Sequence, residues 1–255
     1  MWLRLRQICL VARELEPVVD DLRAVFGLEI AYRDPAVGYY GLENALLPVG
    51  NQFLEVVAPI QEQTAGGRYL EKRGGDGGYM VITQCDDHGP RRRRIKKLGI
   101  RLASQFELKG FQHMQLHPKD TGGSFFEIDC QTDGLESDGP WEPAGTDWWQ
   151  ARRLDVVRAI SAAEIQSPAP RRVAERWSEI SEIPLEADEH DRISLPLENA
   201  RLRFVEPSDG RPEGLGGVDL AAVDRQRALT AAAERGLRSQ DDVILICGTR
   251  FRLHD

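Results

Sequence analysis

The sequence has 255 residues, which is enough for one large domain or two small ones and for a substantial buried core. Hydrophobic residues make up 41% and charged residues 29% of the chain, a composition typical of a folded globular protein rather than a disordered one. The net charge of −8 disfavours a general nucleic-acid binder, because phosphate contacts need a clustered positive surface. No apolar run reaches the roughly 20 residues that a membrane span requires, so we expect no membrane partner.

The N-terminal segment and the cysteines both indicate a cytoplasmic protein. Residues 1–12 carry arginines and a short apolar stretch, but they lack the small-residue cleavage site of a signal peptide, and a strand is the better interpretation. The cysteines are widely spaced, form no C-x-x-C pair and lie within or at the end of strand-like stretches. We therefore expect reduced thiols, at Cys9, Cys85, Cys130 and Cys247.

The first part of the chain predicts a strand, a helix and three further strands. Residues 5–12 form an apolar strand, and apolar residues at helical spacing from about residue 16 predict an amphipathic helix that ends at Gly27. A strand is predicted at 28–32, and two more follow, of which the last covers 53–58. Glu43-Asn44 and Gly50-Asn51 are the turn signals between these last strands.

The same order of elements recurs three times. The second copy is predicted to have strands at 79–85, 100–103, 111–117 and 124–130 and a helix that ends at Gly99. The third has strands at 156–166, 193–197 and 201–206, and the fourth has strands at 218–223, 243–247 and 251–253, each with a helix after its first strand. The sequence therefore predicts an α+β fold built from four βαβββ modules.

The modules group into two predicted domains. The N-terminal domain is expected to cover 1–131, with modules at 1–59 and 77–131, and the C-terminal domain 147–255, with modules at 155–207 and 215–255. A short helix is predicted near 69–72, inside the segment that separates the first two modules. The boundary falls in the Gly- and Pro-containing segment 131–150. We expect the three tryptophans of this segment to cover an interface between the domains rather than to stack on a ligand: Trp141, Trp148 and Trp149.

Three segments carry a family resemblance: RQICLVARELEPVVDDLRAVFGLEI, NQFLEVVAP and HPKDTGGSFFEI. In this order and spacing they resemble the vicinal oxygen chelate superfamily, which includes glyoxalase I, methylmalonyl-CoA epimerase, extradiol dioxygenases and the bleomycin and fosfomycin resistance proteins. The last segment resembles the closing hairpin of methylmalonyl-CoA epimerases. Uncharacterised glyoxalase-like proteins of double length are the most similar in organisation. The resemblance implies two glyoxalase-like domains, in each of which two modules form a cup from curved mixed sheets.

The resemblance also implies a divalent metal held by the first and last strands of each module. Gln7, Glu55 and Glu127 match three of the four ligand positions, and Met80 stands where the fourth ligand would be a histidine. Oxygen ligands suit Mg²⁺, Mn²⁺ or Ca²⁺, whereas imidazole suits Zn²⁺, Fe²⁺ or Ni²⁺, so the sequence does not distinguish among these metals.

Strand alternation gives independent support for a shared concave face. Gln7 and Cys9 lie on one face of their strand, as do Phe53 and Glu55 on theirs. Glu127 stands among apolar residues, where a carboxylate needs a partner. Glu55 and Glu127 are the candidate catalytic groups. The candidate substrate-binding residues are Phe53, Tyr79, Met80, His113, His117 and Phe125.

Each candidate also has a structural interpretation. Gln7 can simply bond neighbouring strands, and the two glutamates can pair with arginines or face solvent. His117 precedes a proline at a hairpin end, where a solvated side chain is expected. The basic run 91–97 is interpreted as the exposed face of a helix, because no aromatic residues interleave with it.

The second pair of modules offers no comparable ligand set. The matching positions are Ile160, Arg203, Gly217 and Arg250, and arginine does not ligate metals. The C-terminal half is therefore expected to support the first half or to form an interface, for instance in a homodimer. The minority alternative is that Arg203 and Arg250 form an anion pocket.

Two functions remain open. The first is a metal-dependent isomerase or lyase of the glyoxalase type, which acts on a small oxygen-rich substrate in the N-terminal cup. The second is a metal-free protein that binds a small molecule, as the resistance proteins of this fold do. Fold alone does not decide between them.

Overall fold

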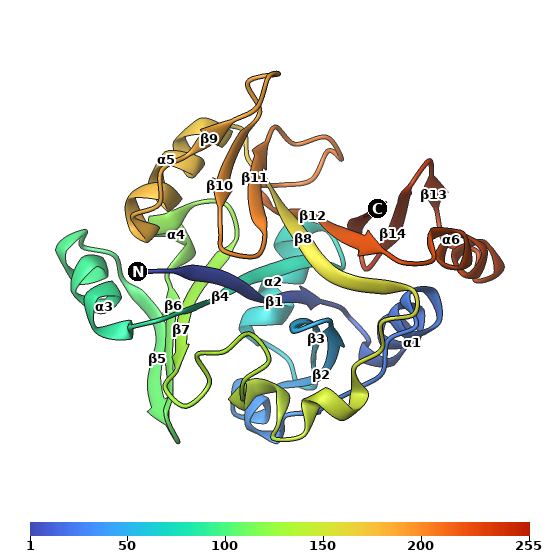
Figure 1. Cartoon of the computed structure of the whole chain (residues 1–255), viewed down its shortest axis with the longest axis horizontal. Helices are drawn as coiled ribbons and strands as arrows, with labels where there is room; N and C mark the ends of the chain where they lie inside the picture. The colour runs from blue at the N-terminus through green and yellow to red at the C-terminus, as the bar shows by residue number, and fades with distance from the viewer.

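The computed structural model describes all residues, 1–255, and consists of two curled mixed sheets with helices around them (Figure 1). The first sheet has the order β2-β3-β1-β4-β7-β6-β5. Its strands are β1 (Leu3–Val11), β2 (Leu42–Val49), β3 (Gln52–Pro59), β4 (Gly77–Cys85), β5 (Leu102–Leu108), β6 (Phe111–Leu116) and β7 (Phe125–Gln131). This architecture confirms the predicted α+β class.

The second sheet has the order β13-β14-β15-β12-β8-β11-β10-β9. Its strands are β8 (Val157–Gln166), β9 (Glu186–Ala187), β10 (Ile193–Pro196), β11 (Arg201–Val205), β12 (Gly214–Ala222), β13 (Ser239–Gln240), β14 (Val243–Ile246) and β15 (Thr249–His254). The α-helices are α1 (Leu15–Phe26), α2 (Ala65–Arg73), α3 (His88–Lys97), α4 (Pro118–Thr121), α5 (Pro170–Ser181) and α6 (Arg225–Glu234), and the 3₁₀ helices are η1 (Pro35–Tyr40), η2 (Glu142–Ala144) and η3 (Trp148–Ala151). No helix has both the length and the apolar character that crossing a membrane would take.

Each sheet joins two modules edge to edge within the chain. β1 pairs antiparallel with β4 at the centre of the first sheet, while β3 runs parallel to β1 and β7 runs parallel to β4. β8 and β12 repeat this central antiparallel pair in the second sheet. The first and last strands of two modules therefore lie side by side, and this places their side chains on one shared concave face.

The main core lies between the two sheets and under the helices. It contains 51 buried residues from both halves of the chain, among them Ile8, Leu10 and Ile160. The sheets pack closely where β4 meets β12: a Cβ atom on Gly78 would lie only 2.5 Å from the side chain of Leu215. In the second half of β1, alternation sends Cys9 and Val11 to the opposite face, where they belong to a separate cluster of 13 buried residues.

Two predicted elements of the first module differ in the structure. Residues 28–32 form no regular strand and contribute only an isolated bridge between Tyr32 and Leu46, because Pro35 begins η1 three residues later. Asn44 does not form a turn but lies inside β2, opposite Val57 of β3. The extended pairing of β2 with β3 overrides the local turn preference of the Glu43-Asn44 pair.

The basic run on α3 is only partly exposed. Arg91 is 1% exposed, and its guanidinium donates to the backbone oxygens of Ser181 and Trp2. Arg94 is half-buried and donates to the backbone oxygen of Glu179 at 2.8 Å. The interpretation of the whole run as a solvated face is therefore wrong for these two arginines, which connect α3 to α5.

The concave face of the second sheet also differs from the prediction. Ile160 is fully buried in the core, and Glu164 of the same strand faces the arginines instead. Glu164 oxygens lie 3.2 Å from Arg203 Nη2 and 2.7 Å from Arg250 Nη2. Asp219 pairs with Arg203 as well, at 2.8 Å. Because carboxylates already neutralise both guanidiniums, the anion pocket, the minority alternative for Arg203 and Arg250, is not formed there.

Candidate functional site

The candidate site lies on the concave face of the first sheet. Glu55 comes from β3 and Glu127 from β7, on either side of the central strands β1 and β4. Both carboxylates are buried, with exposed fractions of 8% and 4%, and neither pairs with an arginine. Each is instead held by amide groups, and Glu127 also lies beside an imidazole.

Glu55 is held by two amides from neighbouring strands. Gln7 Nε2 on β1 donates to Glu55 Oε2 at 2.8 Å, and Asn44 Nδ2 on β2 donates to Glu55 Oε1 at 2.6 Å. Burial raises the pKa of Glu55 above its ordinary value, and the bonds from Asn44, Cys9 and Gln7 offset part of that rise. Both oxygens of this carboxyl group therefore already have partners within the protein.

The segment 131–150 covers this part of the cup. Trp141 is 1% exposed, and its Nε1 donates to Gln7 Oε1 at 3.0 Å. Trp148 packs edge-on against Phe53, with ring centroids 5.1 Å apart. Arg6 Nη2 holds the backbone of the same segment by donating to Gly139 O at 3.0 Å. Trp141 and Trp148 thus fill the part of the concave face beside Gln7 and Phe53, whereas Trp149 is exposed. The expected role of all three at an interface between domains is therefore wrong.

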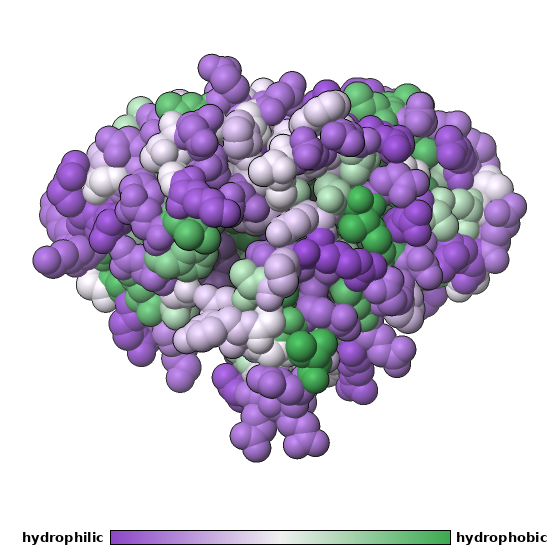
Figure 2. Space-filling model, turned by 90° about the horizontal axis from the view of Figure 1, so that it is seen from below, coloured by the Kyte–Doolittle hydropathy of each residue, from purple (hydrophilic) through white to green (hydrophobic).

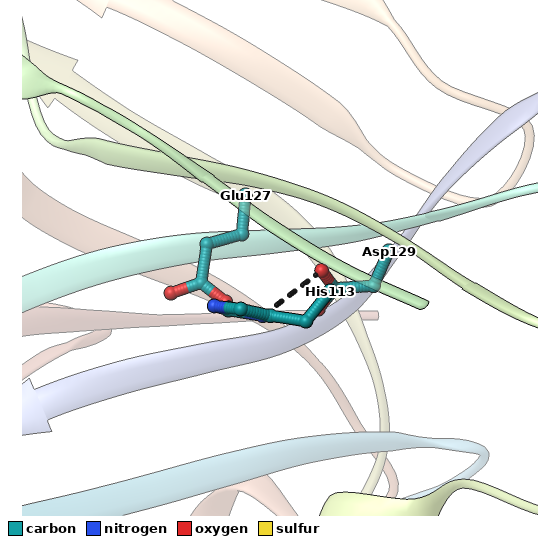
Figure 3. Close-up of side chains that lie close together, drawn as sticks. All are labelled: His113, Glu127 and Asp129. Atoms are coloured by element: carbon teal, nitrogen blue, oxygen red, sulfur yellow. Dashed lines mark ion pairs between the residues drawn. The ribbon is translucent and has the colours of Figure 1, made fainter. Parts of the chain in front are cut away.

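A histidine and two carboxylates meet on β6 and β7 (Figure 3). His113 Nδ1 lies 3.2 Å from Asp129 Oδ1 and 3.5 Å from Glu127 Oε2, and one ligand atom from each residue lies within 4.8 Å of the others. Gln115 Nε2 donates to Glu127 Oε1 at 2.7 Å, and the backbone nitrogen of Met114 donates to Asp129 Oδ1 at 3.0 Å. All three members of the cluster are buried.

Burial and mutual charge shift the pKa values of this cluster. Burial raises the pKa of Glu127 to about 7, and the nearby His113 opposes that rise, while Asp129 and Glu55 add to it. Burial alone would lower the pKa of His113, but the carboxylates of Asp129 and Glu127 raise it to about 9. Glu55 and Glu127 therefore influence each other electrostatically across the cup.

The remaining candidate residues divide into two groups. Met80 Sδ lies 3.3 Å from Gln115 Nε2, so Met80 adjoins the Glu127 cluster. The rings of Tyr79 and Phe125 pack together with centroids 5.0 Å apart on the same side of the cup. His117 lies apart from them at the start of α4, where its Nδ1 accepts a bond from the backbone nitrogen of Lys119 at 3.2 Å.

Three polar residues of the site were not among the sequence candidates: Asn44, Gln115 and Asp129. Asp129 lies two positions after Glu127, and Gln115 lies two positions after His113, so alternation along each strand would have placed them on the same face. Asn44 gave no such signal, because its local sequence resembles a turn.

The ionisation of His113 predicts how stability depends on pH in metal-free protein. The pKa of this group is raised in the folded state, so its stabilising contribution is complete below about pH 6.5 and is lost as the pH rises through about 9. A shift of this size corresponds to about 3 kcal/mol of unfolding free energy. Denaturant unfolding between these pH values should show that decline.

An imidazole titration followed by NMR measures the same effect directly. The His113 midpoint should lie near pH 9 in the wild type and fall by more than one unit in Asp129→Asn. Asp133→Asn is the matched control, since Asp133 is exposed beyond the end of β7. A midpoint that stays the same in Asp129→Asn would contradict the assigned ion pair.

Comparisons with known proteins find similarity over about half of the chain in some proteins and over the whole chain in another. No protein-family model matches the chain. Human mitochondrial methylmalonyl-CoA epimerase is 24% identical over 130 residues, which cover 49% of this chain and 73% of that protein. A hypothetical protein from Staphylococcus aureus aligns in structure with 100% of this chain and 99% of its own at 14% identity and a TM-score of 0.65. Streptomyces coelicolor methylmalonyl-CoA epimerase in complex with 2-nitronate-propionyl-CoA covers 50% of this chain and 96% of its own, at 23% identity and a TM-score of 0.45.

These findings, together with the sheet topology, define the chain as a double-length protein of glyoxalase-like fold. The full-length structural match carries the assignment of the fold. The sequence similarity to human methylmalonyl-CoA epimerase, a vicinal oxygen chelate protein, confirms the predicted resemblance to that superfamily.

Proposed function

We propose that this protein is a metal-dependent isomerase that moves a proton on a small carbonyl-containing substrate bound in the N-terminal cup. The observation that carries the proposal is the buried contact of His113, Glu127 and Asp129 opposite a second buried carboxyl group, Glu55. Epimerisation next to a carbonyl needs a group that removes a proton, a group that returns one, and stabilisation of the charge that develops on the carbonyl oxygen.

The donor set at His113 fits a divalent cation. One imidazole nitrogen and two carboxylate oxygens lie within 4.8 Å of one another, and mixed nitrogen and oxygen ligands suit Zn²⁺, Fe²⁺, Ni²⁺ and Mn²⁺. A cation would also offset the electrostatic cost of burying two carboxylates side by side. When bound, such an ion polarises a substrate carbonyl and stabilises its enolate form.

We infer that His113, Glu127 and Asp129 are the primary ligands, although the family resemblance implies Gln7, Glu55 and Glu127. Both Glu55 oxygens and the Gln7 oxygen already accept hydrogen bonds within 3.0 Å. Glu127 is common to the two sets. Both ligand sets therefore predict that Glu127→Gln loses the metal. Only the set implied by the resemblance predicts that Glu55→Gln loses it as well.

Glu55 is the group of this site that we assign to proton exchange. Burial raises its pKa, which favours a carboxyl group that can hold a proton as well as release one. Gln7 and Asn44 fix the orientation of both its oxygens. The aromatic side chains around it limit the access of water, so a carbanionic intermediate is protected from bulk solvent.

The route into the cup lies beside β6 and β7. Met80, Gln115 and Phe125 are only half-buried, in contrast to the carboxylates beneath them. The exposed hydroxyl groups of Tyr40 in η1 and Ser104 in β5 lie 3.3 Å apart and connect the two ends of the sheet. Figure 2 shows the molecule from below, where most of the surface is hydrophilic and apolar residues form scattered patches. Substrate entry would require the half-buried side chains to move.

Metal analysis and hydrogen exchange together test the proposal. Protein purified without chelators should contain about one divalent ion per chain, and the loaded protein should exchange a substrate C–H for solvent deuterium. The curated relative is by name a methylmalonyl-CoA epimerase, so thioesters with a branched acyl group are the first substrates to test, followed by small 2-oxo and 2-hydroxy compounds. Absence of both metal and exchange, with a compound still bound, would favour the metal-free binding protein instead.

A further inference from the structure

A second groove lies outside the cup, between α3 and the hairpin of β5 and β6. It has a volume of about 540 Å³. Its floor is apolar: Ile100 and the half-buried Leu102 line it, and Ile95 and Met114 lie beneath them, 2% and 0% exposed. Its rim carries the side chains of Arg92, Arg93 and Lys96. An apolar floor under a cationic rim is typical of a site for an amphipathic anion.

The three cations on the rim have no acidic partner in the structure. Arg91 and Arg94 of the same helix are directed toward α5, where they bond backbone oxygens, and Arg94 also lies 3.8 Å from Glu182. With the Gln105 amide turned so that its oxygen faces Arg92, that oxygen accepts hydrogen bonds from Arg92 Nη2 at 2.7 Å and Arg92 Nε at 3.0 Å. This neutral partner leaves the charge of Arg92 uncompensated.

Nearby carboxylates are engaged elsewhere. Asp87 accepts a bond from the backbone nitrogen of Gly89 at 2.8 Å as the N-cap of α3. Asp120 pairs with Arg101 at 2.6 Å. The positive charge on the groove is therefore not neutralised by the surface around it, although the chain as a whole has a net charge of −8.

This arrangement carries a cost in stability that a bound anion would relieve. Arg92 and Lys96 are four residues apart on one helix, a spacing at which like charges repel each other. At the N-terminus of α3, where negative charge is favoured, Asp87 is the N-cap and the first turn adds no further acidic residue. A groove with unpaired cations on its rim and an apolar floor is suited to a ligand that has both an anionic group and an apolar group.

We propose that this groove binds a soluble molecule that carries two or more phosphates on an aromatic or aliphatic group. Three cations within five residues of one helix match the charge of a diphosphate, and Ile100 and Leu102 would contact the apolar part. The volume is that of a small-molecule site. The negative net charge disfavours a nucleic-acid polymer or an anionic membrane as the occupant.

The groove is separate from the candidate metal site. His113 and Met114 are neighbours on β6, but alternation places their side chains on opposite faces of the sheet, with Met114 in the main core. The proposal for the groove therefore does not rest on the proposed isomerase activity. Either can fail without the other.

Calorimetric titration of the whole protein with ADP tests the proposal, with adenosine and inorganic pyrophosphate as partial ligands. ADP should bind more tightly than either partial ligand, and the affinity should weaken as salt concentration rises. In the double variant Arg92→Gln with Arg93→Gln, the Kd for ADP should increase by at least about tenfold. Lys97→Gln is the matched control, because Lys97 lies on the same helix without lining the groove, and its Kd should stay unchanged.

Lys96→Gln alone serves as the second test should the double variant fold poorly, and it should weaken ADP binding in the same direction. Equal affinity of all variants for ADP would overturn the proposal. So would binding of pyrophosphate as tight as that of ADP, since the apolar floor would then contribute nothing. Association with phosphoinositide vesicles without measurable ADP binding would also overturn it, in favour of a membrane surface.

Discussion

Glu127→Gln is expected to abolish stoichiometric metal binding and to slow substrate C–H exchange by about 10²- to 10⁴-fold. Glu127 lies 3.5 Å from His113 Nδ1 and belongs to both proposed ligand sets, so no alternative arrangement of the metal avoids it. The amide keeps the size of the side chain but removes the negative charge that a cation requires. Metal content by mass spectrometry and deuterium incorporation by NMR are the two measurements.

Two further variants make this result specific. Glu107→Gln is the control, because Glu107 lies on β5 of the same sheet but is exposed to solvent. It should keep full metal content and full exchange. Glu55→Gln should keep the metal and lose the exchange, since we assign Glu55 to proton transfer. Retention of full metal content in Glu127→Gln would refute the site, whatever the activity.

Trp141→Ala is expected to lower the free energy of unfolding by about 3 to 5 kcal/mol. The indole is 1% exposed, packs edge-on against Phe111 with ring centroids 5.2 Å apart, and bonds the buried oxygen of Gln7. Its removal leaves a large cavity over the concave face and an acceptor without its partner. Denaturant unfolding measures the loss.

Trp149→Ala provides the matched control for this prediction. Trp149 comes from the same segment of the chain but is 57% exposed, so its removal should change stability by no more than about 0.5 kcal/mol. Trp141→Phe separates packing from hydrogen bonding, because it keeps a ring and loses only the N–H donor, at a cost of about 1 kcal/mol beyond the change in size. Similar losses for the two alanine variants would show that Trp141 does not cover the cup.

The alternation of side chains along the strands predicts correctly which residues share the concave face. Alternation placed Gln7 and Cys9 on one face of β1 and Phe53 and Glu55 on one face of β3, and the structure has Cys9 and Phe53 in the concave cluster. The same rule could have added Asp129 to Glu127. It could not reveal that the carboxylates lie within reach of His113, because the register of β6 against β7 depends on long-range pairing.

The predictions that the structure contradicts fail because they depend on contacts between distant parts of the chain. Tyr32 was placed in a strand that shrinks to one bridge, and Arg91 was placed in solvent although α5 packs over it. Local patterns carry no information about a neighbour that is distant in the chain. Trp141 is the clearest case. It lies in a connection that contains several Gly and Pro residues, and no local pattern predicts that its indole bonds Gln7, which is 134 positions earlier in the sequence.

By itself, the sequence determined the α+β class, the repeated order of the elements and the alternating faces of the strands, because these depend on the periodicity of neighbouring residues. Tertiary structure decided which polar groups meet. The curvature of the first sheet and the register of its strands bring His113, Glu127 and Asp129 within 4.8 Å, and the packing of Trp141 seals the opposite side of the cup. Such contacts form because the folded chain as a whole buries its apolar surface, and the sequence of one local segment does not predict them.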